Sequence, residues 1–169
     1  MPRLHCPVCG FDNLTGADIC DNCGADLAGH DVPQATTTFH GTLLGEHLDE
    51  LGGPPPVIVS PDMAVEAVIE QMQGAEADCV LVVERDRLIG IFTDRDAVVK
   101  AAGRPLASLR LRDLMTPDPV VLRHDDPIAV AIHKMAVGGF RHIPLVEDGR
   151  PTGVVTARDV FAHLSRTLA

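Results

Sequence analysis

The hydrophobic pattern of the chain describes the same series of elements twice. Residues 57–59 and 120–122 each form a short apolar run, which predicts a strand. A helix is predicted after each strand, because apolar residues then recur at helical spacing. These residues are Val65, Val68, Ile69 and Met72 in the first series and Ile128, Ala131, Ile132 and Met135 in the second.

Two further strands and a second helix complete each series. The strands are expected at 79–84 and 88–92 in the first series and at 143–147 and 153–155 in the second. A tight polar turn joins each pair of strands, which is typical of a hairpin. The last helix begins near Asp94 in the first series and near Ala157 in the second. Both series therefore have the order β-α-β-β-α, which predicts an α+β fold.

A shift of 63 residues superimposes the two series without a gap. The matching pairs include Leu48 and Leu111, Pro54 and Pro117, Met72 and Met135, Arg87 and Arg150, Gly90 and Gly153, and Arg95-Asp96 and Arg158-Asp159. Such a repeat indicates one structural unit that occurs twice. Because three strands and two helices leave an apolar face uncovered, we expect the two copies to pack sheet to sheet about a pseudo-twofold axis.

Three short motifs of the second copy resemble those of the cystathionine-beta-synthase (CBS) domain family. They are Leu111-Arg112-Asp113-Leu114-Met115-Thr116, Arg141-His142-Ile143-Pro144-Leu145-Val146 and Gly153-Val154-Val155-Thr156-Ala157-Arg158-Asp159. The resemblance covers both copies, as CBS domain 1 at 43–105 and CBS domain 2 at 106–169. It implies a Bateman module, a tandem pair that commonly dimerises and binds adenosine-containing ligands such as AMP, ADP, ATP or S-adenosylmethionine between its halves.

The resemblance also implies a set of ligand-binding residues. Thr93-x-x-Asp96 and Thr156-x-x-Asp159 stand where the last strand turns into the last helix, a pattern that a helix capping box alone would also explain. In CBS domains this pattern places the carboxylate on the ribose hydroxyls and the hydroxyl near ribose or phosphate. A carboxylate suits a diol and repels a phosphate, so a phosphate requires a cation elsewhere.

Cations and apolar strand residues complete this expected set. The phosphate candidates are Arg141, His142 and Arg158, with Arg95, Arg123 and His124 behind them. Adenine is expected along the first strands, at Ile58, Val59, Val121 and Leu122. The copies differ here, because the first has Asp78 and Cys79 where the second has Arg141 and His142. An acidic residue and a thiol offer no cation, so unequal sites are expected. Cys79 itself is interpreted as a small core residue.

The first 28 residues contain a different signal, two C-x2-C pairs separated by ten residues. The pairs are Cys6 with Cys9 and Cys20 with Cys23, and a glycine follows each pair, at Gly10 and Gly24. This spacing is typical of a tetrahedral zinc site, and the segment resembles a zinc ribbon. An iron site of the rubredoxin kind and two disulfides are the alternatives. Residues 29–42 are interpreted as a linker, and His5 and His30 as solvated histidines rather than ligands.

Composition limits the classes of function. The 169 residues, 46% of them hydrophobic, suffice for a main domain and a small appendage. A net charge of −10 disfavours general attraction to nucleic acid or anionic membranes. Because no apolar run could span a bilayer and the N-terminus lacks a secretory signal, a cytoplasmic location is expected.

The sequence favours a sensor over an enzyme. It contains no Gly-rich phosphate loop, nucleophile elbow or open metal triad. The leading hypothesis is a regulatory module, expected to be a homodimer, that binds an adenosyl ligand while a structural zinc ribbon recognises a protein partner. The alternative is an adaptor, in which the pair is a dimeric scaffold with empty clefts and the ribbon binds the partner. Nucleic-acid binding through the ribbon ranks below both.

Overall fold

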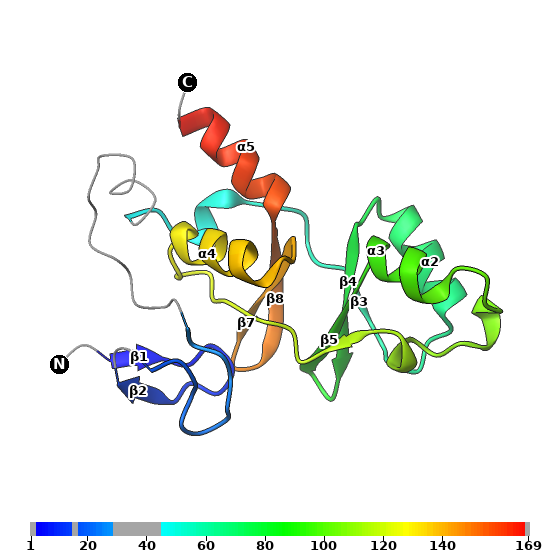
Figure 1. Ribbon diagram of the computed structural model, residues 1–169, viewed down its shortest axis with the longest axis horizontal. Helices are drawn as coiled ribbons and strands as arrows, with labels where there is room; N and C mark the ends of the chain where they lie inside the picture. The colour runs from blue at the N-terminus through cyan, green and yellow to red at the C-terminus, as the bar shows by residue number, and fades with distance from the viewer. Residues whose placement is uncertain (1–2, 15–16, 29–44, 168–169) are drawn as a thin grey trace. The chain divides into compact units, whose positions relative to one another are not determined.

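The computed structural model describes residues 3–14, 17–28 and 45–167 (Figure 1). The predicted linker at 29–42, with His30, lies outside these residues. The contacts divide the chain into two compact units. We call Pro55–Pro119 the copy-1 unit, and Met1–Pro54 with Val120–Ala169 the copy-2 unit.

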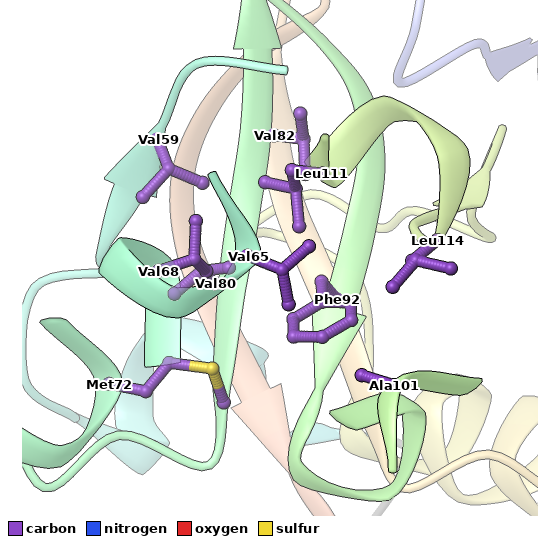
Figure 2. Close-up of a cluster of buried hydrophobic side chains, with 10 residues drawn as sticks. All are labelled: Val59, Val65, Val68, Met72, Val80, Val82, Phe92, Ala101, Leu111 and Leu114. Atoms are coloured by element: carbon purple, nitrogen blue, oxygen red, sulfur yellow. The ribbon is translucent and has the colours of Figure 1, made fainter. Parts of the chain in front are cut away.

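A four-stranded sheet forms the centre of the copy-1 unit. Its strands, in spatial order, are β3 (Ile58–Val59), β4 (Cys79–Glu84), β5 (Arg87–Thr93) and β6 (Thr116–Pro117). Strand β3 is parallel to β4, and the remaining pairs are antiparallel. Helix α2 (Val65–Gly74) packs its apolar side chains Val65, Val68 and Met72 against the sheet, around the fully buried Phe92 (Figure 2).

The predicted last helix of the first copy is irregular. It begins as the single turn α3 (Asp94–Asp96) and continues as the π-helix η2 (Ala97–Ala101). Two short 3-10 helices, η3 (Leu106–Ser108) and η4 (Leu111–Asp113), follow it.

The copy-2 unit repeats this order with fewer strand residues. Helix α4 (Ile128–Gly138) is followed by the hairpin β7 (His142–Glu147) and β8 (Arg150–Thr156) and by helix α5 (Ala157–Thr167). The strand predicted at 120–122 is reduced to one parallel bridge, between Leu122 and Leu145. In the copy-1 unit, Leu81 N–H donates to the Val57 carbonyl at 2.8 Å. The matching residue in the second copy is Pro144, which has no N–H to donate, so this pairing cannot extend.

The segments that precede the two first strands are exchanged between the units. Leu48, at the start of the 3-10 helix η1 (Leu48–Leu51), is buried in the copy-2 cluster with Leu122 and Ile128. Its counterpart Leu111, in η4, is buried in the copy-1 cluster. The backbone bonds match as well, because Leu48 N–H donates to residue 126 and Leu111 N–H to residue 63, each at 3.0 Å. Each unit therefore contains the leading segment of the other sequence repeat.

The cysteine-rich segment, residues 3–14 and 17–28, forms a small substructure that we call the ribbon. Strands β1 (Arg3–His5) and β2 (Asp12–Leu14) pair antiparallel, and a bridge joins Ile19 to Asp26. Its buried cluster consists of two of the cysteines and Leu27, with smaller side chains around them. So small a core requires a further source of stability, which a bound metal supplies in such segments.

The structure confirms the α+β class and the order β-α-β-β-α in the first copy. In the second copy the same order holds except that a single bridge replaces the first strand. Among the described residues, no helix is both long and apolar enough to cross a membrane.

Candidate functional site

The four ribbon cysteines converge on one point. The Sγ atoms of Cys6, Cys9, Cys20 and Cys23 all lie within 4.8 Å of one another, and all four are free thiols. Separations of 3.6 Å join Cys6 to Cys23 and Cys9 to Cys20. A tetrahedron with metal–sulfur bonds of about 2.3 Å has sulfur–sulfur edges of about 3.8 Å, so the four donors fit a zinc ion.

The backbone of each C-x2-C pair shapes a matching turn. Gly10 N–H donates to the Cys6 carbonyl and Gly24 N–H to the Cys20 carbonyl, both at 2.9 Å. These glycines have φ values of 72° and 73°, a region that residues with a side chain rarely adopt. Glycine therefore suits both positions.

The thiols differ in how readily they ionise. Burial raises the pKa of Cys6 to about 12. Burial also opposes ionisation of Cys20, but hydrogen bonds from the Cys23 and Asn22 backbone and from the Asn13 side chain lower its pKa to about 6. Asn13 is 2% exposed, and its Nδ2 lies 3.6 Å from the Cys20 Sγ. This contribution could not be predicted from the sequence, because a lone Asn belongs to no motif.

The first predicted ligand motif, in the copy-1 unit, forms a complete capping box. Asp96 Oδ2 accepts hydrogen bonds from the Thr93 backbone N–H at 3.0 Å and from its hydroxyl at 2.9 Å. Asp96 N–H donates to Thr93 Oγ1 at 3.2 Å. One carboxylate oxygen is thus committed to the helix start, and Oδ1 alone remains for other partners.

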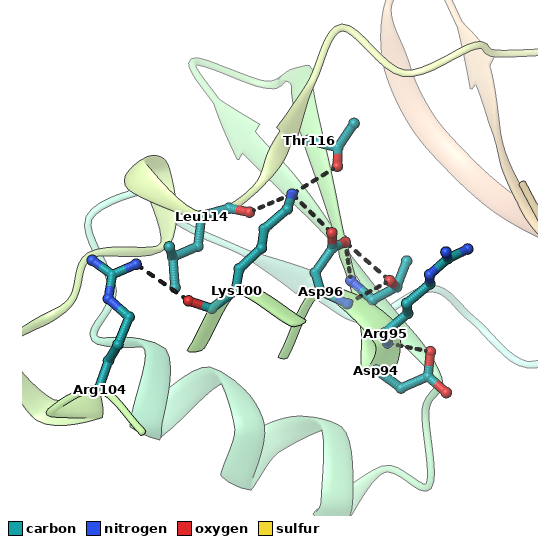
Figure 3. Close-up of polar contacts among 8 residues, drawn as sticks. Asp94, Arg95, Asp96, Lys100, Arg104, Leu114 and Thr116 are labelled. Carbon is teal, nitrogen blue, oxygen red and sulfur yellow. Dashed lines mark hydrogen bonds and ion pairs between the residues drawn. The ribbon is translucent and has the colours of Figure 1, made fainter. Parts of the chain in front are cut away.

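Lys100 forms an ion pair with that remaining oxygen. Its Nζ lies 2.8 Å from Asp96 Oδ1, 2.9 Å from the Leu114 carbonyl oxygen and 3.2 Å from Thr116 Oγ1 (Figure 3). An ammonium group has three hydrogens to donate, so these three acceptors use all of them. In this state Lys100 has no donor left for a ligand phosphate, and Asp96 can receive a sugar hydroxyl only by sharing or breaking the ion pair.

The second motif has the same cap without the lysine. Asp159 Oδ2 accepts from the Thr156 N–H at 2.9 Å and from its hydroxyl at 2.6 Å. Within the described part of the chain, Asp159 Oδ1 has no hydrogen-bond or ion-pair partner. The counterpart of Lys100 is His163, whose Nε2 lies 2.8 Å from Glu46 Oε2. The two copies therefore offer carboxylates in different states.

Comparison with known proteins identifies the repeat. The model of the CBS domain family matches residues 48–103 and 111–166. The chain belongs to the CBS-domain family. YlbB of Bacillus subtilis, an uncharacterized protein, is 34% identical over 102 residues, which are 59% of this chain and 68% of that protein. The chain spans only 53% and 66% of the length of two further curated relatives.

Solved structures agree with this assignment. The CBS-domain protein ATU1752 from Agrobacterium tumefaciens is 26% identical, with a TM-score of 0.65 over 70% of this chain and 99% of that chain. The CBS domain pair of MJ0100, in complex with 5'-methylthioadenosine and S-adenosyl-L-methionine, has a TM-score of 0.66 over 72% of this chain and 98% of its own. At 18% identity, MJ0100 shows the fold alone.

The residues of the neighbouring strand differ in charge between the two motifs. In the second CBS domain, His142 pairs with Thr156 across the hairpin, and Ala157 N–H donates to the Arg141 carbonyl at 2.9 Å. In the first CBS domain, the corresponding neighbour of Thr93 is Cys79. The structure thus brings the predicted cations Arg141 and His142 beside the second motif, and it places a thiol beside the first.

The remaining predicted residues differ in exposure and in hydrogen-bond partners. Arg158 is exposed next to Asp159, and Ile58 is 50% exposed. The side chains of Val59, Val121 and Leu122 are buried, so only their backbone groups are available to a ligand. Two of the cations considered in reserve have intramolecular partners. Arg123 Nε lies 3.0 Å from Asp125, and His124 Nε2 lies 2.9 Å from Thr152.

Proposed function

We propose that this protein is a regulatory sensor that binds an adenine nucleotide or a related adenosyl ligand, with the ribose on Asp159 of the second CBS domain. The observation that carries the proposal is the difference between the two motifs. Asp159 keeps one oxygen without a partner among the described residues, whereas Lys100 occupies the equivalent oxygen of Asp96. A ribose diol supplies two O–H donors, and a carboxylate oxygen accepts them.

The surroundings of Asp159 suit the rest of such a ligand. Arg141 is exposed, and its side chain has no hydrogen-bond or ion-pair partner among the described residues, so it can turn to a phosphate or to the carboxylate of an amino-acid moiety. The complex of MJ0100 with two adenosyl compounds supports this ligand class for a chain of the same fold. We propose AMP, ADP, ATP and S-adenosylmethionine as the first candidates.

A zinc ion is the proposed occupant of the four-cysteine site, in a structural role. Four sulfur ligands leave a tetrahedral ion no open position, so no reaction is assigned to it. The ribbon is proposed to recognise a protein partner. Elemental analysis of the purified chain tests the metal: we expect one zinc per chain, and iron or no metal would overturn this assignment.

A homodimer is proposed from the exposed apolar side chains of the helices. Val98 and Val99 on η2 and Val137 and Phe161 on α4 and α5 are 71–76% exposed. A second copy that packs on these helices would cover such side chains. Sedimentation equilibrium measures the mass in solution, and a monomer at all concentrations would contradict the proposal.

A thermal-shift panel tests the sensor directly. Metal-loaded full-length protein is heated with AMP, ADP, ATP, NADH or S-adenosylmethionine. A ligand that binds only the folded state raises the melting temperature as its concentration rises above Kd. We expect at least one adenosyl compound to do so. If none does at millimolar concentration, the sensor proposal fails and the adaptor becomes the better description.

A further inference from the structure

Lys134 is the one charged residue among those described that is almost completely buried, with 5% of its surface exposed. It lies on helix α4, within the apolar sequence Ile128–Gly138. A lysine is rarely buried unless its ammonium group has close partners, because removing the charge from water is costly. Its partners therefore show what covers this part of the helix.

The partners of Lys134 belong to the ribbon. Its Nζ donates to the Ala28 carbonyl at 2.7 Å and lies 3.4 Å from Asp26 Oδ2. The ribbon fold fixes both acceptors, because Asp26 pairs with Ile19 and the intervening Leu27 is buried in the ribbon core. The two contacts join segments more than 100 residues apart, at separations of 106 and 108.

A second contact lies at the first C-x2-C turn. A Cβ atom added to Gly10 would lie 3.7 Å from Asp148 Oδ1, so this turn of the ribbon adjoins the turn between β7 and β8. The ribbon core is nevertheless separate from the cluster that contains Leu122 and Ile128. Contacts of this polar kind, without a shared core, are typical of domains that can separate and dock again.

The other copy provides a comparison within the chain. The residue that corresponds to Lys134 is Gln71 on helix α2, and it is exposed. In both helices the side that faces the sheet is apolar, with Val65, Val68 and Met72 in α2 and their counterparts in α4. Packing against the sheet therefore does not explain a buried lysine. The buried lysine therefore occurs in the copy that contacts the ribbon.

We propose that the metal-loaded ribbon is a docking domain for helix α4 of the second CBS domain, held by Lys134, and that loss of the metal releases it. Without a metal, the core around Leu27 is too small to keep the acceptors at Asp26 and Ala28 in place. Metal loading of the ribbon would thus be sensed by the same domain that carries Asp159. The contact itself does not depend on a bound adenosyl ligand.

The chain has two lysines, Lys100 and Lys134, which makes the test simple. Full-length protein is acetylated with an amine-reactive ester, without any nucleotide, and each lysine is quantified by mass spectrometry. Removal of zinc by a chelator should speed the acetylation of Lys134 on the order of tenfold, because burial now protects it and local release exposes it. Lys100, in the other unit, should change less than about twofold. A Cys9→Ser, Cys23→Ser variant should show the fast reaction with or without zinc.

Two outcomes would overturn the proposal. Either Lys134 reacts equally fast with and without zinc, or both lysines accelerate together, which would mean general unfolding. A Lys134→Gln variant, with Gln71→Ala as its control, tests the anchor by hydrogen exchange of the zinc-loaded ribbon. Faster exchange of residues 17–28 in Lys134→Gln alone supports docking, and unchanged exchange refutes it. Because no ligand is present, failure of the sensor proposal would leave these results unaffected.

Discussion

Replacing Asp159 by Asn, with Asp96→Asn as the matched change, separates ligand binding from helix capping. Both carboxylates accept two bonds from the preceding threonine, at 2.6–2.9 Å for Asp159 and 2.9–3.0 Å for Asp96. Asn keeps an oxygen for the cap, so each variant should lose no more than about 1 kcal/mol of stability from this source. Asp96→Asn also breaks the pair with Lys100, which is worth about 0.5 kcal/mol, since the lysine is 36% exposed.

The two variants should differ in affinity. Hydrogen bonds from a ribose diol to an ionised acceptor contribute about 1.5–3 kcal/mol, so Asp159→Asn should weaken adenosyl-ligand binding roughly 10- to 150-fold. Asp96 holds Lys100 at 2.8 Å, and a ligand there gains little, so Asp96→Asn should change Kd by less than about threefold. Isothermal titration of zinc-loaded protein measures both. Equal losses of affinity in the two variants would refute the argument that Lys100 closes the first motif. If neither variant loses affinity, the ribose binds to neither carboxylate.

Three further predictions rest on single features. Lys100→Met frees Asp96 Oδ1, so the titration stoichiometry should rise from one ligand per chain towards two; an unchanged value would contradict the role given to Lys100. Leu48→Ala should cost about 3 kcal/mol and Leu111→Ala a similar amount. Hydrogen exchange should show that Leu48→Ala destabilises the copy-2 unit and that Leu111→Ala destabilises the copy-1 unit. The opposite result would contradict the exchange of the leading segments. Burial, aided by two neighbouring carboxylates, raises the pKa of Cys79 to about 12. Its thiol therefore stays protonated below pH 9, so iodoacetamide at pH 8 should leave Cys79 of the native protein unmodified, and its rapid alkylation in the folded chain would contradict this prediction.

The order of elements could be predicted because it depends on local periodicity, and the repeat confirmed each assignment independently. The strand at 120–122 was the exception. Its apolar run is as good as that at 57–59, but strand formation depends on a donor in the neighbouring strand, and Pro144 lacks one. The core in which Leu48 is buried could not be predicted from the local sequence pattern either. An apolar residue at a short helix shows that it will be buried, and does not show in which of two similar cores.

The candidate site was predictable in its residue types and less so in its state. Spacing alone predicted that the four cysteines lie together and that each Thr-x-x-Asp stands at the start of a helix. The pairing of Asp96 with Lys100 could have been anticipated, because residues four apart face each other on a helix. Lys134 could not, since a lysine on an amphipathic helix is ordinarily solvated, and the acceptors that bury it lie more than 100 residues away.

The departures from symmetry between the copies point in one direction. Lys100 fills the carboxylate of the first motif, and its counterpart His163 leaves Asp159 untouched. Gln71 is exposed on the first helix, whereas Lys134 joins the second to the ribbon. The open carboxylate and the ribbon contact therefore fall in the same unit, so the two proposals above assign both inputs to the second CBS domain. The first CBS domain, with its motif held by an internal ion pair, is better suited to a structural role.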